Sequence, residues 1–350
     1  MILQREKFGQ MKLGIDIRPL LSRPTGVGIW LMGLLSSLKN KTSHEFVYFS
    51  SSLKDSPDDN LKRQLPEGLY IHRRIPVRIL DRLLLNIFWP DFEILTGMKV
   101  DLTLSPTPIY FPTSGKKIIT IHDLFFYEYP ESAGKFRMYS KVLKKSIKNA
   151  DLIIAVSNYT YKKLLSYFPE ASGKTKVIYE GLRKFPEPQR IEALPQKFLL
   201  FVGSCIPRKN PDFAIEVSEL SGLSLVIVGS CEKKSRKILT LGYVSDGKLR
   251  YLYENAFALV FPSLDEGFGL PVLEAMRFGL PVIALKKGAI PEVGGEAILY
   301  GKNPEEFAKL IEKLKDDEFR EMVAQREKER SRNFSWEKAG NEFLKALEEL

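Results

Sequence analysis

The sequence predicts an α/β protein of two domains, each built on a parallel β-sheet with helices on both faces. Three observations support this fold class: short β-branched apolar runs alternate with helical patterns, a proline-rich break divides the chain, and the chain has 350 residues. That length is too great for one ordinary hydrophobic core and suits two domains of about 150 to 180 residues.

The apolar runs give the expected strands of each domain. Continuous apolar runs are typical of strands that are buried on both faces, as in parallel sheets covered by helices. Six runs precede the break and four follow it: residues 13–17, 46–49, 102–104, 118–121, 152–156 and 177–179, then 198–202, 223–228, 258–261 and 281–284.

The break at residues 183–196 contains three prolines and no periodicity, which predicts a linker at 184–196. We therefore expect an N-terminal Rossmann-like domain at 11–183 and a C-terminal Rossmann-like domain at 197–335. The sequence from 304 onward is rich in Glu, Lys and Leu and predicts helices, the last of them at 336–350.

The net charge of +10 is concentrated in the first half of the chain. Residues 1–190 carry a net charge of +12 and residues 191–350 carry −2. A basic half indicates an anionic partner, which is a nucleic acid, a membrane surface or a phosphorylated substrate. No run of eighteen apolar residues occurs, so we expect no membrane-spanning helix.

Two further features of the sequence indicate where in the cell the protein is located. Residues 1–10 are polar and lack the apolar stretch of a signal peptide, so we expect a loose extension there. The two cysteines, Cys205 and Cys231, lack the spacing of metal ligands. We expect them to be reduced thiols of a cytoplasmic protein.

The most informative segment is SLDEGFGLPVLEAMRFGLPVIA at residues 263–284, which follows an expected strand. Gly267 and Gly269 allow a tight turn, and Pro271 suits the first turn of a helix. A glycine turn that leads into a helix presents backbone N–H groups and a positive dipole end. The segment therefore predicts a site for phosphate or sugar oxygens.

Glu266 precedes this turn and Glu274 lies one turn into the helix, so the two carboxylates can hold sugar and ribose hydroxyls on either side of a pyrophosphate. The segment resembles the signature of family-4 retaining glycosyltransferases, whose paired glutamates stand eight residues apart. The similarity extends through residues 242–263 and 290–293 and is closest to the bacterial branch that includes many mannosyltransferases. It implies the GT-B fold, in which two Rossmann-like domains face each other across a central cleft, with the donor held mainly by the C-terminal domain.

A second segment, VGSCIPRKN at residues 202–210, follows the first strand of the second domain. Arg208 and Lys209 are expected at the carboxyl end of that strand, where ligands of open α/β sheets bind. Two cations there can neutralise a departing nucleoside diphosphate. Lys209 matches the diphosphate lysine of the family and Arg208 its companion. Ser204 stands where many members carry an arginine, so part of the phosphate charge is expected to be met elsewhere.

In the first half, the loop at residues 18–28 carries Gly26 and Gly28 ahead of an apolar helix at 29–38. It resembles the N-terminal glycine loop of the family, which faces the diphosphate and the acceptor. An ordinary βα turn remains the alternative, because Gly-x-Gly alone is a weak signal. The segment TIHD at 120–123 ends another strand, and the resemblance implies that His122 contacts the donor sugar with Asp123 beside it.

The expected site is therefore as follows. The catalytic residues are Glu266, Lys209, Arg208 and His122, and the donor-binding residues are Gly267, Phe268, Gly269, Leu270, Glu274, Val244, Ser204, Gly28, Gly26 and Asp123. Phe268 belongs to this set by position, although loop packing suits its side chain better. Val244 is expected at the nucleobase through backbone groups.

No metal and no cofactor are expected, because the sequence contains no Asp-x-Asp pair and its three histidines are widely spaced. The donor is a nucleotide sugar, and the branch resemblance makes GDP-mannose the first expectation. Another GT-B enzyme, such as a nucleotide-sugar epimerase or a phosphorylase, remains an alternative. A nucleic-acid-binding protein is a weaker one, since no recognised module is present.

The acceptor is expected to be a glycan or a lipid-linked acceptor. The segment at residues 135–148 predicts a helix with Arg137, Lys141, Lys144, Lys145 and Lys148 on one face and Tyr139, Val142, Leu143 and Ile147 on the core side. A second basic cluster, Arg73, Arg74, Arg78 and Arg82, adjoins the apolar stretch 79–89. Both clusters are compatible with ordinary solvated charge or with peripheral attachment to an anionic inner membrane face.

Overall fold

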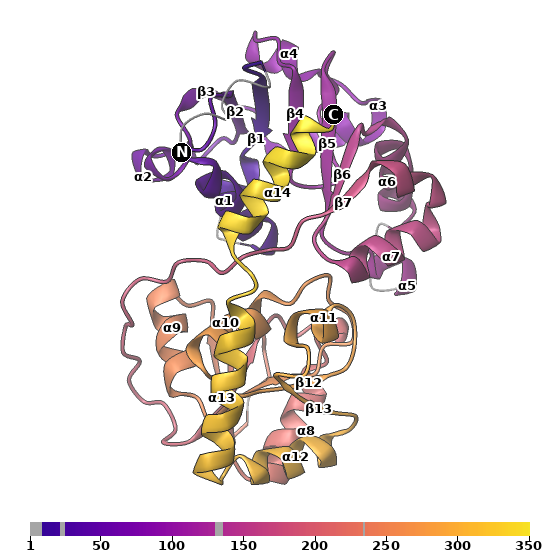
Figure 1. Cartoon of the computed structure of the whole chain (residues 1–350). Helices are drawn as coiled ribbons and strands as arrows, with labels where there is room; N and C mark the ends of the chain where they lie inside the picture. Colours follow the sequence, from indigo (N-terminus) through magenta and orange to yellow (C-terminus); the bar gives the residue numbers. More distant parts are fainter. Residues whose placement is uncertain (1–8, 22–24, 130–135, 234) are drawn as a thin grey trace, which may run out of the picture. The chain divides into compact units, whose positions relative to one another are not determined.

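A computed structural model describes residues 9–21, 25–129, 136–233 and 235–350, without the side chains of 136–139. The chain forms two compact units (Figure 1). The first comprises the described residues up to Gly181 together with Ser335–Leu350, and the second is Leu182–Phe334. Both sheets are parallel at every strand pair that the described residues form, as the apolar runs predict.

The first unit is built on a seven-stranded sheet with the order β3-β2-β1-β4-β5-β6-β7. Its strands are β1 (Lys12–Asp16), β2 (Glu45–Ser51), β3 (Gly68–Arg73), β4 (Leu102–Ser105), β5 (Lys116–Ile121), β6 (Leu152–Ala155) and β7 (Thr175–Val177). The interior strands are buried on both faces, so they read as continuous apolar runs in the sequence.

Four helices of the first unit begin at a residue whose side chain caps them. Thr25, Asp58, Ser157 and Ser335 each accept a hydrogen bond from a backbone N–H of the first turn that follows. The helices are α1 (Gly26–Leu38), α2 (Asp59–Gln64), α3 (Val77–Ile87), α4 (Phe92–Thr96), α5 (Phe125–Glu128), α6 (Phe136–Asn149), α7 (Asn158–Tyr167) and α14 (Trp336–Glu348).

Helix α14 brings the C-terminus back to the first unit, where it packs along α1 (Figure 1). Glycines make the close approach possible. A Cβ on Gly33 would lie 2.0 Å from the Trp336 ring, and one on Gly340 would lie 2.2 Å from the Ser37 hydroxyl. The terminal helix that the sequence predicts at 336–350 is therefore an integral part of the N-terminal unit.

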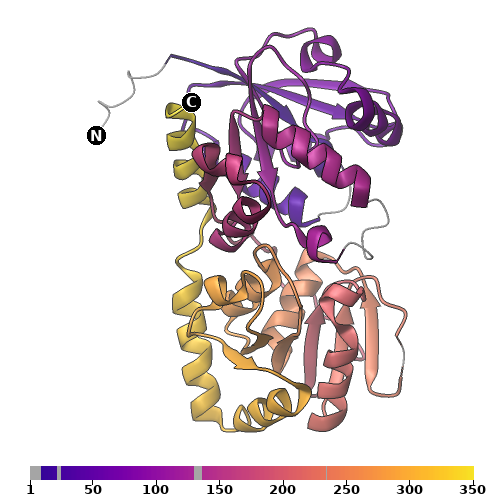
Figure 2. The same ribbon diagram turned by 90° about the vertical axis from the view of Figure 1, so that its right-hand side faces the viewer.

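The second unit is built on a six-stranded sheet with the order β10-β9-β8-β11-β12-β13. Helices lie on both of its sides (Figure 2). The strands are β8 (Phe198–Val202), β9 (Ser224–Val228), β10 (Ile238–Gly242), β11 (Ala258–Phe261), β12 (Val282–Leu285) and β13 (Leu299–Gly301). The helices are α8 (Pro211–Ser221), α9 (Asp246–Asn255), α10 (Leu270–Phe278), α11 (Ile290–Gly294), α12 (Pro304–Lys313) and α13 (Asp317–Ser331).

The segment at residues 184–196 runs along α9 of the second unit. The Gln189 N–H donates to the Gly247 carbonyl at 2.9 Å, and Arg250 donates to the Pro186 carbonyl at 3.0 Å. A Cβ on Gly247 would lie 2.8 Å from the Glu187 carbonyl oxygen, so the chain can pass this close only because that position is glycine.

The expectation of reduced thiols is wrong in this structure, where Cys205 and Cys231 form a disulfide. The two residues follow the neighbouring parallel strands β8 and β9, whose loops lie side by side. The Cys205 N–H donates to the Ser230 carbonyl at 2.8 Å, and the two cysteine Cα atoms are 4.9 Å apart, within disulfide range. Sequence spacing could not show this, because the pairing depends on the order of the strands in the sheet.

Candidate active site

The charged residues expected at the catalytic site of the second unit lie at the carboxyl ends of two neighbouring strands. Strands β8 and β11 pair in parallel, so the loops that follow them leave the sheet at the same edge. The loop after β8 carries Arg208 and Lys209 in a short 3-10 turn. The loop after β11 joins it, since the Leu264 N–H donates to the Arg208 carbonyl at 2.8 Å.

Glu266 is the centre of this group, with only 7% of its surface exposed. Its carboxylate accepts hydrogen bonds from Lys209 Nζ at 2.5 Å, from Arg208 Nη1 at 3.2 Å and from the Ser263 hydroxyl at 2.5 Å. Burial raises the pKa of Glu266, but the charges of Lys209 and Arg208 and the hydrogen bonds of Lys209 and Ser263 lower it by more, so the pKa lies below its ordinary value. The carboxylate is therefore ionised at neutral pH.

The main chain of Glu266 is fixed by the loop that follows β12. The Ala289 N–H donates to the Glu266 carbonyl at 2.8 Å. Gly288 adopts a φ of +60°, and a Cβ there would lie 2.6 Å from the Glu266 nitrogen. This contact needs glycine for both its conformation and its lack of a side chain.

The two cations are directed at Glu266 rather than at solvent. Arg208 Nη1 also donates to the Asp265 carbonyl at 2.7 Å, and Lys209 Nζ lies 5.6 Å from the centre of the Phe261 ring. The sequence did not single out Ser263, whose hydroxyl completes the group. Its position three residues before Glu266, just after a strand, was the available signal.

The glycine turn leads into α10 as the sequence predicts. Gly269 adopts a φ of +106° as the N-cap, and its carbonyl accepts from the Val272 N–H at 3.0 Å. Leu270 is the first helical residue. Phe268 is buried and packs edge-on against Phe334, so its side chain has the packing role that its type suggests.

Glu274 belongs to a separate hydrogen-bonded group, which the sequence did not reveal. Its side chain is 3% exposed, and it accepts from Arg183 Nε at 2.7 Å and from the Tyr253 hydroxyl at 2.8 Å. Burial raises the pKa of Glu274, and Arg183 and Tyr253 offset only part of that effect. Arg183 lies in the segment that was expected to end the first domain, so sequence position gave no hint of this role.

Ser204 and Val244 lie at the same carboxyl edge of the second sheet, after β8 and β10, and both are half-buried. The Ser204 carbonyl accepts from the Ile206 N–H at 2.9 Å. Gly242, with a φ of +64°, ends β10, and its carbonyl accepts from the Gly229 N–H at 2.8 Å. The expected phosphate and nucleobase positions are therefore on one edge.

His122 and Asp123 lie in the first unit, directly after β5. His122 Nε2 donates to the Pro106 carbonyl at 3.0 Å, and Nδ1 lies 3.5 Å from Oε1 of the buried Glu180. The imidazole also makes an edge-on contact with Trp30, with 5.5 Å between ring centres. The ring is thus fixed on three sides, and Glu180 is a neighbour that the sequence did not single out. Asp123 is half-buried.

The expectation that Gly26 and Gly28 form a loop ahead of the helix is wrong. Helix α1 begins at Gly26, and the Thr25 hydroxyl accepts from the Gly28 N–H at 3.3 Å. A Cβ on Gly28 would lie 2.9 Å from the Pro19 carbonyl oxygen, so this glycine allows a close approach of backbone. The cap at Thr25 extends the helix one turn further back than the apolar pattern indicates, and residues 22–24 of the loop lie outside the described part.

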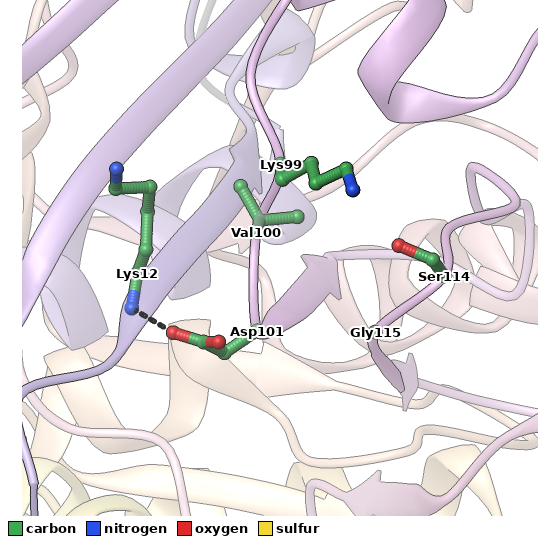
Figure 3. Close-up of a pocket in the computed structure, with 6 residues that line it drawn as sticks. All are labelled: Lys12, Lys99, Val100, Asp101, Ser114 and Gly115. Atoms are coloured by element: carbon green, nitrogen blue, oxygen red, sulfur yellow. Dashed lines mark hydrogen bonds between the residues drawn. The ribbon is translucent and has the colours of Figure 1, made fainter.

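A pocket of about 410 Å³ lies at the opposite, amino end of the first sheet (Figure 3). In it, the Lys12 N–H donates to Asp101 Oδ2 at 2.7 Å. The pocket is lined by Lys12, Lys99, Val100, Asp101, Ser114 and Gly115, none of which belongs to the expected site. Within the described ranges, no group of three or more His, Cys, Asp or Glu side chains could hold a metal ion.

Two parallel-sheet domains with a lysine–arginine–glutamate cluster at the carboxyl edge of the second sheet are the arrangement expected of a GT-B glycosyltransferase. The family model described as Glycosyltransferase Family 4 matches residues 24–183, and the model described as Glycosyl transferases group 1 matches residues 185–332. Together the two models cover most of the chain. The chain therefore belongs to glycosyltransferase family 4. The resemblance inferred from the glutamate segment is confirmed.

The relatives include bacterial O-antigen chain mannosyltransferases. The chain is 29% identical to O-antigen chain mannosyltransferase B of Escherichia coli over 270 residues, which is 67% of this chain and 71% of that protein. It is 28% identical to O-antigen chain mannosyltransferase RfbU of Salmonella typhimurium over 249 residues, 65% of this chain and 70% of that one.

Solved structures agree in fold. Sucrose-phosphate synthase of Thermosynechococcus elongatus matches with a TM-score of 0.75 and 19% identity, over 97% of this chain and 99% of that one. HepE of Anabaena, in complex with UDP-glucose, matches with a TM-score of 0.71 and 17% identity, over 97% and 100% of the two chains. At these identities the likeness concerns the fold, and it confirms the predicted GT-B class.

Proposed function

We propose that this glycosyltransferase is a retaining hexosyltransferase that moves mannose from GDP-mannose to a glycan or lipid-linked acceptor. The observation that carries the proposal is the buried cluster of Glu266, Lys209 and Arg208. The mannosyltransferase names of the relatives support the choice of sugar. A structural relative that holds UDP-glucose supports a nucleotide-sugar donor.

The cluster suits a reaction in which negative charge develops on a leaving diphosphate. Lys209 and Arg208 stabilise that charge, which is largest in the transition state. Glu266 accepts hydrogen bonds from the sugar hydroxyls, Glu274 from the ribose, and the turn at Gly267 and Gly269 offers backbone N–H groups. His122, to which the family resemblance gives a contact with the donor sugar, is held in one orientation by its partners in the first unit.

The proposed chemistry needs no covalent nucleophile from the protein. The acceptor hydroxyl oxygen bonds to the anomeric carbon on the face from which the diphosphate departs. The bond from that carbon to the diphosphate oxygen breaks with its electron pair, and the acceptor proton passes to the departing phosphate. Because two cations already face the site, we also propose that a divalent metal is not required.

A panel of GDP-, UDP- and ADP-sugars in thermal shift tests the donor, since a ligand that binds only the native state raises its stability. GDP-mannose is expected to give the largest shift. Product analysis by NMR with a mannose-containing acceptor then tests retention, and the same assay in excess EDTA tests metal independence. Sugar conversion without any acceptor would instead support an epimerase.

A further inference from the structure

The Arg183 guanidinium joins two carboxylates of the second unit. Its Nε donates to Glu274 Oε1 at 2.7 Å, its Nη2 reaches Glu274 Oε2 at 3.5 Å, and its Nη1 donates to Asp246 Oδ1 at 2.7 Å. The guanidinium carbon also lies 4.4 Å from the centre of the Phe185 ring. Arg183 is the second residue of this unit, and its side chain is only 14% exposed. The long, flexible side chain is therefore held in one place.

Glu274 depends on this arginine for its charge. A carboxylate that is 3% exposed is disfavoured in its ionised form, and a partner with a fixed positive charge offsets that cost. The charged and titratable groups around it are Arg183, Tyr253 and Asp246. Of these, only Arg183 is positive.

Glu274 depends on the same partners for its orientation. An ionised carboxylate has about four lone-pair directions. Arg183 Nε takes one on Oε1, and Arg183 Nη2 and the Tyr253 hydroxyl both reach Oε2. The carboxylate plane is thereby fixed, and the remaining lone pair, on Oε1, has a defined direction.

We propose that Arg183 is a positioning residue that holds Glu274 ionised and turned so that its remaining lone pair on Oε1 accepts a ribose hydroxyl of the donor. This inference rests on the proposed function, in which Glu274 holds the ribose. By this inference, Arg183 at the start of the second unit helps the enzyme to select ribonucleotide over deoxyribonucleotide donors. Three of the five N–H groups of Arg183 are directed at two carboxylates, so a diphosphate contact is not its role.

Calorimetry with GDP and 2′,3′-dideoxy-GDP, and with the matching UDP pair, tests the proposal. The wild type is expected to bind the ribose form more tightly. Arg183→Met is expected to weaken binding of the ribose form about tenfold and to leave the dideoxy form unchanged, since hydrogen bonds to a charged group are lost or misaligned. Arg250→Met, which removes an arginine of α9 that pairs with Glu254 and Glu187, is the matched control and should preserve both affinities.

A pH series separates positioning from a merely structural role. In Arg183→Met, the ratio of ribose to dideoxy affinity should rise with pH, because Glu274 must lose its proton without help from a cation. The ratio cancels the titration of the phosphates. Arg183→Lys restores the charge and should abolish the added pH dependence. Tyr253→Phe keeps the cation, so it should weaken ribose binding and add a smaller pH dependence than Arg183→Met does.

A variant in which Glu274 is neutral controls for the possibility that Arg183→Met acts by disturbing the fold. In a Glu274→Gln background no buried charge is left unpaired, and Arg183→Met should then have no further effect on ribose selectivity. The proposal is overturned if Arg183→Met weakens the ribose and dideoxy forms equally, or changes neither. A wild type that binds GDP and UDP but does not distinguish ribose also overturns it, whereas a wild type that binds no nucleoside diphosphate refutes the proposed function itself.

Discussion

At the scale of single residues, the two glutamates of one short segment lie in opposite electrostatic settings. Glu266 faces two cations, which lower its pKa, whereas Glu274 shares one arginine with Asp246 and keeps a raised pKa. Spacing in the sequence identified the pair and suggested a different ligand for each, but it could not show that their charged partners differ. The difference arises from partners that lie 57 and 91 residues away in the chain.

Lys209→Ala tests the cation cluster. We expect kcat to fall on the order of 100-fold or more, because the lysine stabilises charge that is largest in the transition state. Turnover of the preferred donor is the measurement, with circular dichroism to verify folding. Lys233→Ala, which removes an exposed lysine paired with Asp212, should leave turnover unchanged. A folded Lys209→Ala enzyme with near-normal turnover would place this lysine away from the diphosphate.

Glu327 of α13 has no exposed surface, and its Oε1 accepts from the Val282 N–H at 2.9 Å. Burial raises its pKa well above the ordinary value, and the Val282 hydrogen bond and Arg326 offset this only in part. The folded state therefore binds the proton more tightly than the unfolded state. That contribution to the free energy of unfolding is present below the unfolded pKa of about 4.3 and is lost as pH rises toward the folded pKa.

Glu327→Gln removes this titration and keeps an acceptor for the Val282 N–H. Relative to the wild type, the variant should gain stability as pH rises from 5 to 9, by at most about 1.4 kcal/mol per pH unit. Urea unfolding at several pH values measures the difference. Glu321→Gln, at an exposed position of the same helix, should show no such trend. A constant difference across pH would mean that Glu327 is ionised in the folded protein.

At the scale of elements, the strands that the sequence predicts are present with their ends within two residues of the expected positions. Three strands were missed, namely β3, β10 and β13. All are at sheet edges, where most residues are only half-buried or exposed. An edge strand has one neighbour and less cover, so it lacks the continuous apolar run by which buried strands are recognised.

The same limit applies to the site. Sequence position placed Lys209, Arg208 and Glu266 on one sheet edge, because motifs after parallel strands meet there. It could not place Arg183 on Glu274, Glu180 beside His122 or Cys231 on Cys205, because these contacts depend on strand order and on where irregular segments run. Local patterns carry no information about such pairings.

Two glycines of α1 test how α14 is held. Gly33→Ala places a Cβ 2.0 Å from the Trp336 ring, so either the ring or the helix must move. We expect a loss of about 1 to 3 kcal/mol in unfolding free energy, despite the better helix propensity of alanine. Gly26→Ala, in the first turn with no heavy atom within 4 Å of its Cβ, should be neutral or stabilising by up to about 1 kcal/mol. Unfolding in denaturant measures the free energy of unfolding of both variants. Equal effects at the two positions would mean that α14 is not tightly packed.

At the scale of the whole molecule, the charge is divided unevenly between the two halves of the chain, with +12 in residues 1–190 and −2 in the remainder. Helix α6 contributes strongly to this excess. Its core side carries the buried Val142, Leu143 and Ile147, as the helical spacing predicts. Its exposed residues include Lys141, Lys144, Lys145 and Lys148. Lys135 and the side chains of Arg137 and Tyr139 lie outside the described part.

The second basic cluster adjoins this helix. Lys145 Nζ lies 3.3 Å from the centre of the Phe88 ring, at the end of α3. Exposed apolar side chains accompany the arginines Arg78 and Arg82 there, since Ile79, Ile87 and Trp89 are each about half exposed at 54%, 62% and 49%. Arg73 makes one hydrogen bond within the fold, from its Nε to the Leu95 carbonyl at 2.7 Å. Basic residues beside exposed aromatic and aliphatic ones form a surface that suits the headgroup region of an anionic bilayer.

No helix in the described ranges is long and apolar enough to span a bilayer. We propose that α6 and the end of α3 attach the enzyme reversibly to an anionic membrane face, where a lipid-linked acceptor would be available. Sedimentation with liposomes should show binding that rises with anionic lipid content and falls with salt, because each basic residue near the surface contributes about 1 kcal/mol.

Changing Lys141, Lys144, Lys145 and Lys148 to Gln should abolish most of that binding. The same charge change at Lys302, Lys309, Lys313 and Lys315, which are exposed in the second unit, is the control and should have little effect. Equal losses from both sets would mean that net charge alone drives adsorption, and a wild type that ignores anionic liposomes at low salt would favour an acceptor that is not embedded in a membrane.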